Sequence, residues 1–90
     1  MKELKITTQF KKDLKKYKNQ HHKIAKLKEV LSILQCGGSL PSQYNAHKLL
    51  GNYKGCIECH IENDTLLIWI DEEQNVIKLL RLGTHSELFK

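Results

Sequence analysis

Hydrophobic residues recur along the first third of the chain at the spacing of amphipathic helices. The first set lies on one helical face with lysines between its members: Phe10, Leu14 and Tyr17. A polar pair at 19–20 interrupts the pattern, and a second helical set follows: Ile24, Leu27, Leu31 and Leu34. Gly37-Gly38 can end the second helix through a left-handed cap. The pattern predicts a helical hairpin whose first helix has a basic outer face.

From residue 54 onward the pattern changes to the alternation that is typical of strands. Three such segments, residues 55–62, 65–70 and 76–82, are joined by short turns, of which the second covers 71–75. They predict an antiparallel meander. A weaker alternation over residues 3–7 predicts a short first strand at a sheet edge. Residues 39–52 contain Pro41, Gly51 and His47 and predict a loop with one short turn.

These elements define the expected fold class as α+β: an N-terminal strand and a helical hairpin packed on a small, mainly antiparallel sheet. Ninety residues with 40% hydrophobic content support one modest core, so a single domain spanning 1–90 is expected. No apolar stretch reaches the length of a signal peptide or of a membrane span. We therefore expect a cytoplasmic protein without a membrane partner.

The charge of the chain suggests the kind of partner that it binds. Fifteen Lys and Arg residues against ten Asp and Glu give a formal net charge of +5. The excess lies mostly between Lys2 and Lys28 and indicates a polyanionic partner such as nucleic acid, although a solvated helical face explains lysines alone equally well. Three cysteines without an export signal predict reduced thiols rather than a disulfide framework.

The run Cys56-Ile57-Glu58-Cys59-His60 matches the C-x-x-C-H pattern of covalent haem attachment. Alternation along a strand places Cys56 and His60 on one face and Cys59 on the other, so the two thiols cannot share a haem or a metal. A zinc site from Cys56, His60 and a distant histidine is geometrically possible. Small apolar packing is the simpler interpretation of both cysteines. We expect no metal and no cofactor.

The second half of the chain carries groups suited to RNA cleavage. Imidazoles can give and take protons near neutral pH, carboxylates can orient them, and basic side chains can hold a phosphate. The candidate catalytic residues are His47, Glu58, His60, Asp64 and His85. The candidate RNA or phosphate contacts are Lys54, Arg81 and Phe89.

Several of these residues have structural alternatives. Asp64 stands where turn chemistry alone favours an aspartate. Arg81 lies in an apolar strand, where its charge needs either a phosphate or an internal salt bridge with Glu58. Phe89 can anchor the C-terminus in the core or stack on a base. Trp69 lies in an apolar run and is expected in the core.

The chain resembles the YafQ branch of RelE-type bacterial toxins over essentially its whole length. The resemblance lies in the order of the helical hairpin, the candidate residues and a C-terminal run that begins at Gly83. The most specific part is the run Gly83-Thr84-His85-Ser86-Glu87-Leu88-Phe89. The resemblance implies a RelE-like fold and ribosome-dependent endonucleolytic cleavage of messenger RNA, without a metal. It also implies a cognate antitoxin as partner, typically acidic and encoded by the adjacent gene.

The resemblance further implies how the site works. The ribose 2′-hydroxyl attacks the adjacent phosphate, and His85 acts as the general acid. His60 and Asp64 act as the base or as a base and its orienting group. His47 adds a proton transfer or a phosphate contact, and Glu58 stands in the same catalytic set at a position where an aspartate is also found.

Lys54 and Arg81 complete this implied site by stabilising charge. Ile57 stands at a position that is often basic in relatives, and Thr65 stands where some relatives have an aromatic residue. Because these two differences bear on RNA docking, the family's preference for adenine-rich lysine codons is an expectation here. Two other functions fit the same chain. One is a gyrase-poisoning toxin of the related ParE type, and the other is a non-catalytic RNA-binding module.

Overall fold

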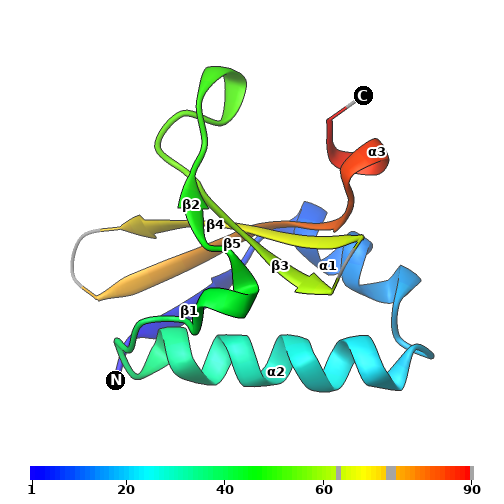
Figure 1. Cartoon of the computed structure of the whole chain (residues 1–90), viewed down its shortest axis with the longest axis horizontal. Helices are drawn as coiled ribbons and strands as arrows, with labels where there is room; N and C mark the ends of the chain where they lie inside the picture. The colour runs from blue at the N-terminus through cyan, green and yellow to red at the C-terminus, as the bar shows by residue number, and fades with distance from the viewer. Residues whose placement is uncertain (63, 73–74, 90) are drawn as a thin grey trace.

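The computed structural model describes residues 1–62, 64–72 and 75–89. Within these ranges five strands form one sheet in the order β1-β5-β4-β3-β2, and the helical hairpin lies along it (Figure 1). Strand β1 runs parallel to β5, whereas the other neighbouring strands are antiparallel. The elements are β1 (Glu3–Ile6), α1 (Thr8–Lys16), α2 (His21–Gln35), β2 (His47–Lys48), β3 (Ile57–Glu62), β4 (Thr65–Glu72), β5 (Val76–Thr84) and α3 (His85–Leu88). The predicted α+β fold, with the first strand at a sheet edge, is confirmed.

Local capping sets the limits of the hairpin. The hydroxyl of Thr7 accepts a hydrogen bond from the backbone N–H of Phe10 at 3.1 Å and so caps the start of α1. Just beyond α2, Gly37 has a φ of +76°, a left-handed conformation that glycine adopts without strain. The backbone N–H of Gly38 donates to the carbonyl of Ile33 at 3.0 Å. The predicted glycine cap is therefore confirmed.

Alternate residues of the sheet belong to two different hydrophobic clusters. The cluster that the hairpin covers includes Cys59 and Trp69, and the cluster on the opposite face joins Cys56 and Ile68 to Leu88 of α3. The predicted separation of the two cysteines onto opposite faces is confirmed, and so is the core position of Trp69. Burial raises the pKa of the Cys59 thiol to about 12, so this cysteine is an uncharged packing residue.

The segment predicted as a loop carries more structure than its composition suggests. His47–Lys48 forms β2, an edge strand that pairs with β3. Two short 3₁₀ turns flank it, Ser42–Tyr44 and Gly51–Tyr53. A strand of two residues is too short to show a periodicity, and the pairing of β2 depends on β3, which lies further along the chain. The sequence pattern therefore gave no sign of β2.

The last two strands extend beyond their predicted limits. Strand β4 continues to Glu72 and β5 continues to Thr84, because ladder pairing with a neighbour goes on past the apolar run. Asp71 and Glu72 consequently belong to a strand rather than to the predicted turn. Residues 73 and 74 of that turn lie outside the described residues. Helix α3 follows β5 directly.

Candidate active site

His47 is held between two hydrogen-bond acceptors at the edge of the sheet. It lies opposite Glu58 in the β2–β3 ladder, and its Nε2 is 3.0 Å from Oε2 of Glu58. Its Nδ1 is 2.8 Å from the backbone carbonyl of Asn45. Because a carbonyl can only accept, Nδ1 is the nitrogen that donates to Asn45, and Nε2 faces the carboxylate, which can hold a proton that the ring takes up. The pair is therefore built to hold a transferable proton next to an oriented imidazole.

Glu58 is a buried carboxylate, although strand alternation placed it on an open face. Its side chain is 7% exposed, and its Oε1 has no hydrogen-bond partner among the described residues. Leaving one oxygen of a buried carboxylate unpaired costs free energy. Packing alone does not explain that cost, whereas the orientation of His47 does.

His60 lies two residues further along β3. The centroid of its ring is 6.4 Å from that of the His47 ring. This separation is short enough for one bound phosphodiester to contact both imidazoles. His60 also lines a cavity of about 400 Å³ between α2 and β3, so one side of its ring is open to a ligand.

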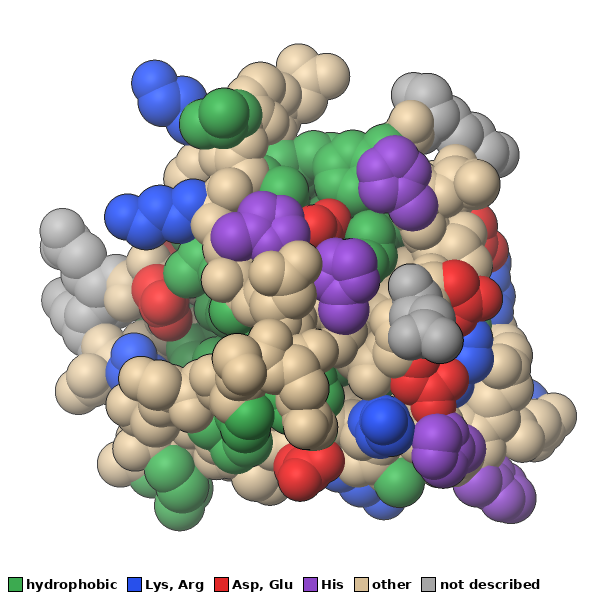
Figure 2. Space-filling view, viewed as in Figure 1, with side chains coloured by type: hydrophobic (Ala, Val, Ile, Leu, Met, Phe, Trp, Pro, Cys, Tyr) green, Lys and Arg blue, Asp and Glu red, His purple; other side chains and the backbone are tan. Residues whose placement is uncertain are grey.

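His85 begins α3 at the end of β5, beside the end of β3 that carries His60. The two strand ends are neighbours because Leu66 of β4 pairs with His60 on one side and with Gly83 on the other. His85 is exposed and packs against Phe89, with ring centroids 4.9 Å apart. Figure 2 shows histidine side chains around an acidic and apolar patch on one face. The fold thus gathers histidines from separate parts of the chain.

A capping box fixes the short helix that carries His85. Oγ1 of Thr84 accepts from the backbone N–H of Glu87 at 3.2 Å, and Oε1 of Glu87 accepts from the backbone N–H of Thr84 at 2.8 Å. Tyr17 donates its hydroxyl to the same Glu87 oxygen at 2.8 Å. The hydrogen bonds from Thr84 and Tyr17 lower the pKa of the Glu87 carboxyl. The Thr-x-x-Glu spacing is the sequence signal for this cap, whereas nothing in the pattern marks Tyr17 as its third member.

Phe89 is partly buried between two rings. It packs against His85 on one side and against Tyr53 on the other, with a Tyr53 centroid distance of 5.3 Å in an edge arrangement. One side of the Phe89 ring is therefore anchored in the apolar cluster, as one of the two alternatives predicted, and the rest of the ring reaches the surface, where stacking on a base stays a prediction. Lys54 is exposed next to Tyr53.

Arg81 is paired with Asp13 of α1, so the predicted alternative of a salt bridge with Glu58 is wrong. Nε of Arg81 donates to Oδ2 of Asp13 at 2.8 Å, and the backbone N–H of Leu82 donates to the same oxygen at 3.0 Å. Burial alone would raise the pKa of Asp13, but these hydrogen bonds outweigh it and lower the pKa overall. The sequence held a signal for this pair, because Asp13 lies on the apolar face of α1.

Asp64 lies at the predicted turn but contacts other residues than expected. Its carboxylate, 67% exposed, accepts from Nζ of Lys23 at 3.2 Å and from the hydroxyl of Thr65 at 3.1 Å. The Lys23 hydrogen bond is the main cause of a lowered pKa at Asp64. Across the described parts of the chain no hydrogen bond joins Asp64 to His60. A β-bulge between His60 and Glu62 separates this turn from the imidazole.

The described residues 1–62, 64–72 and 75–89 contain neither a membrane-spanning helix nor a cluster of metal ligands. No helix within these ranges is long and apolar enough to cross a membrane. No three His, Cys, Asp or Glu side chains in the same ranges are arranged to hold a metal ion.

The fold is shared with solved structures of bacterial toxins. A metal-bound toxin from Helicobacter pylori superposes with a TM-score of 0.90 at 36% identity, over 99% of this chain and 100% of that one. YafQ in the Escherichia coli DinJ-YafQ complex superposes with a TM-score of 0.85 at 31% identity, over 100% of both chains. The chain therefore has a RelE-like toxin fold, because its strand order and its helical hairpin agree with those of these toxin structures.

Sequence comparison narrows the class to one family. The family model for YafQ, a bacterial toxin of type II toxin-antitoxin systems, matches residues 2–90 of this chain. The mRNA interferase toxin YafQ of Escherichia coli (strain K12) is 32% identical over 88 residues, which cover 97% of this chain and 95% of that protein. The chain belongs to the YafQ family of type II toxins.

Proposed function

We propose that this toxin is an endoribonuclease that cuts messenger RNA on the translating ribosome, in the cytoplasm. The name of the E. coli relative, mRNA interferase toxin, supports the activity, and the net charge of +5 supports a polyanionic substrate. The observation that carries the proposal is the His47–Glu58 pair at 3.0 Å, with the His60 ring 6.4 Å from that of His47. An oriented imidazole beside a second imidazole suits acid-base cleavage of a phosphodiester.

The proposed reaction uses the RNA's own hydroxyl as nucleophile. A base removes the proton of the ribose 2′-hydroxyl, and the oxygen attacks the adjacent phosphorus. An acid protonates the 5′-oxygen as its bond to phosphorus breaks. The products are a 2′,3′-cyclic phosphate on one fragment and a 5′-hydroxyl on the other.

The histidines divide the proton transfers. His47 suits the base, since the buried Glu58 carboxylate stabilises the imidazolium that forms when it takes a proton. His60 lies close enough to share that step or to hold the phosphate. His85, exposed at the start of α3, is the proposed acid. Asp64 can orient His60 only if RNA binding releases it from Lys23.

The remaining candidates are proposed to hold the RNA. Lys54 is exposed and presents its ammonium group to solvent, where a phosphate can reach it. Arg81 is 25% exposed and already balanced by Asp13, so its share in charge stabilisation is smaller than that of an unpaired arginine. Phe89 offers the open part of its ring to a base.

A cognate antitoxin is the proposed inhibitor. The E. coli relative is known in complex with DinJ. A basic toxin surface with a net charge of +5 fits an acidic partner.

The test is to induce the chain in bacteria and to map new messenger-RNA 5′ ends across translated frames. His85→Ala is the site variant, and His21→Ala is the matched control, because His21 is an exposed histidine at the start of α2. We expect in-frame 5′-hydroxyl ends with the wild type and with His21→Ala, and none with His85→Ala.

Other outcomes separate the alternatives. Growth arrest without new ends, together with trapped DNA breaks, would indicate a gyrase poison. Growth arrest that persists in His85→Ala would favour a non-catalytic RNA-binding module.

A further inference from the structure

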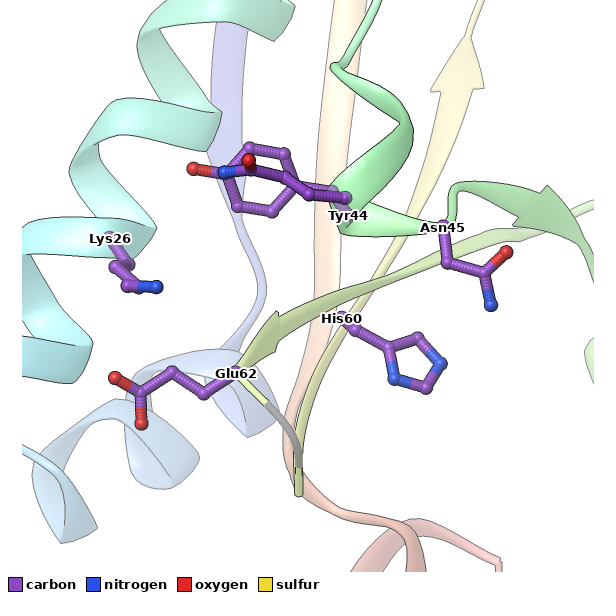
Figure 3. A pocket seen from close by; sticks show the side chains of 6 residues that line it. Lys26, Tyr44, Asn45, His60 and Glu62 are labelled. Carbon is purple, nitrogen blue, oxygen red and sulfur yellow. The ribbon is translucent and has the colours of Figure 1, made fainter.

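A pocket opens beside the histidine cluster, between α2, β3 and the turn that precedes β2. Its volume is about 400 Å³, within the range of small-molecule sites. Figure 3 shows Lys26 and Glu62 on one side of it, His60 and Asn45 on the other, and Tyr44 above them. Its lining residues are Lys26, Gln43, Tyr44, Asn45, His60 and Glu62. Of these, only His60 belongs to the candidate catalytic set.

Backbone features set the walls of this pocket. Asn45 has a φ of +48°, a left-handed conformation that ends the 3₁₀ turn. The β-bulge between His60 and Glu62 sends these two side chains in different directions, Glu62 toward α2 and His60 toward Asn45 (Figure 3). Without the bulge, residues two apart on a strand would point to the same side.

The lining is polar and carries both donors and acceptors. Gln43 and Asn45 are exposed amides, each able to donate and accept, and Lys26 adds donors. Tyr44 is 2% exposed, and its hydroxyl donates to Glu29 at 2.6 Å, so it forms a fixed wall rather than a mobile group. Amide side chains pair with the edges of unstacked bases, and single-stranded RNA is recognised through such edges.

We infer that this pocket receives one unstacked base of the messenger RNA next to the cleaved phosphate and reads it through Gln43 and Asn45, with Lys26 on the RNA backbone. The inference rests on the proposed function. His60 connects the two sites, because it lines the pocket and lies beside His47. Asn45 does so as well, because its carbonyl binds Nδ1 of His47. A base held here fixes which phosphodiester reaches the histidines.

A second pocket offers a competing position for a base. It has a volume of about 430 Å³ and lies beside α3, and its lining residues are Leu50, Asn52, Tyr53, Leu88 and Phe89. Its apolar rings can stack on any base, and Asn52 is its one amide. The amide-lined pocket is the better site for discrimination between bases, since stacking tolerates every base.

The test maps cleavage ends over all translated codon contexts for the wild type and three variants. Gln43→Ala/Asn45→Gly removes both amides, and glycine preserves the left-handed backbone at 45. Asn52→Ala removes the amide of the competing pocket, and Lys28→Gln is a charge control on the exposed side of α2. We expect the double variant to lose about tenfold in base preference at one position flanking the cut, with cutting retained. Asn52→Ala and Lys28→Gln should keep the wild-type preference.

Other patterns overturn the inference. These are an unchanged preference in the double variant, an equal loss of cutting in every context, or a relaxed preference in Asn52→Ala instead. If the wild type itself makes no cuts, the proposed function fails, and the pocket is tested separately by NMR titration with short single-stranded A, C and U oligoribonucleotides. Shifts at Lys26, Gln43 and Asn45 that the double variant loses would support the pocket, and shifts elsewhere would refute it.

Discussion

Asp13 shows how a single polar residue can join two layers of this fold. It lies in α1 and is 2% exposed, yet three donors reach it: Arg81, Leu82 and Gln9. A buried carboxylate is tolerated only when it is paired and hydrogen-bonded in this way. The pair joins α1 to β5.

We predict that Asp13→Asn lowers the free energy of unfolding by about 2 kcal/mol at pH 7, because it leaves the partly buried Arg81 without an anion. The folded-state pKa of Asp13 lies below its ordinary value of 3.8. Its contribution is therefore complete above that value and is lost as the pH falls through the folded pKa. Urea unfolding from pH 7 to pH 3 should show the difference between wild type and variant shrinking.

The matched control is Asp71→Asn, since the Asp71 side chain is 48% exposed and its Oδ1 lies as far as 3.8 Å from Nζ of Lys2. An exposed pair of this kind contributes little, so this variant should change stability by less than about 1 kcal/mol. Equal effects of the two substitutions at pH 7 would show that the Asp13–Arg81 pair stabilises the fold no more than an exposed pair does.

Glu58 is predicted to serve the reaction more than the fold. Glu58→Gln keeps the shape of the side chain but removes the charge that holds His47. We expect cleavage to fall about a hundredfold, with a changed pH profile, and the free energy of unfolding to change by less than about 1 kcal/mol, because the substitution also removes a buried charge. Cleavage assays over pH and urea unfolding measure both. Glu72→Gln, exposed on β4, is the control. Loss of stability without a change in the pH profile would assign Glu58 a structural role.

At the scale of elements, α3 depends on its cap. A helix of four residues has almost no stability of its own. It is held by Thr84, by Glu87 and by the Tyr17 hydroxyl, while Leu88 packs on the sheet face that carries Ile68. The position of His85 thus follows from contacts that its neighbours make.

Thr84→Ala should cost about 1 kcal/mol, because it removes the acceptor for the Glu87 N–H. It should also lower cleavage, because α3 then no longer fixes His85 and Phe89. Thr84→Ser keeps the hydroxyl and should restore both properties. Thermal unfolding and end mapping test the pair of variants. Full activity in Thr84→Ala would mean that the cap is not needed to position His85.

At the scale of the whole molecule, the positive charge is unevenly distributed. Helix α1 and the residues after it present exposed lysines on the outer side of the hairpin: Lys11, Lys12, Lys15, Lys16 and Lys18. The inner side of the same helix carries Phe10 and the Asp13 pair. A cationic surface on a rigid support suits contact with ribosomal RNA.

We predict that ribosome association weakens steeply with salt, since each RNA phosphate contact releases a counterion. Lys11→Gln/Lys15→Gln should make the slope of log affinity against log salt shallower by about 1.5. The control is Lys5→Gln/Lys78→Gln, which makes the same change in charge at exposed lysines paired across β1 and β5. Sedimentation with ribosomes at several salt concentrations gives the slopes. Association that is insensitive to salt would contradict the prediction.

The local pattern of the sequence determined the helical hairpin and the antiparallel strands of this molecule. Helical spacing and the glycines at 37 and 38 defined the hairpin, and alternation defined the meander and placed Cys56 and Cys59 on opposite faces. The candidate residues His47, His60 and His85 were also named from the sequence. The inferences about the hairpin and the meander succeed because periodicity and capping depend on residues that are close together in the chain.

Tertiary structure decided which groups meet. It paired Arg81 with Asp13 rather than Glu58, and Asp64 with Lys23 rather than His60. It also buried Glu58 against an edge strand, β2, that has only two residues. Sheet register, a β-bulge and helix packing set these contacts between residues that are distant in sequence. Spacing along the chain carries no record of such distances, so the sequence named the chemical groups of the site and only the fold assigned their partners.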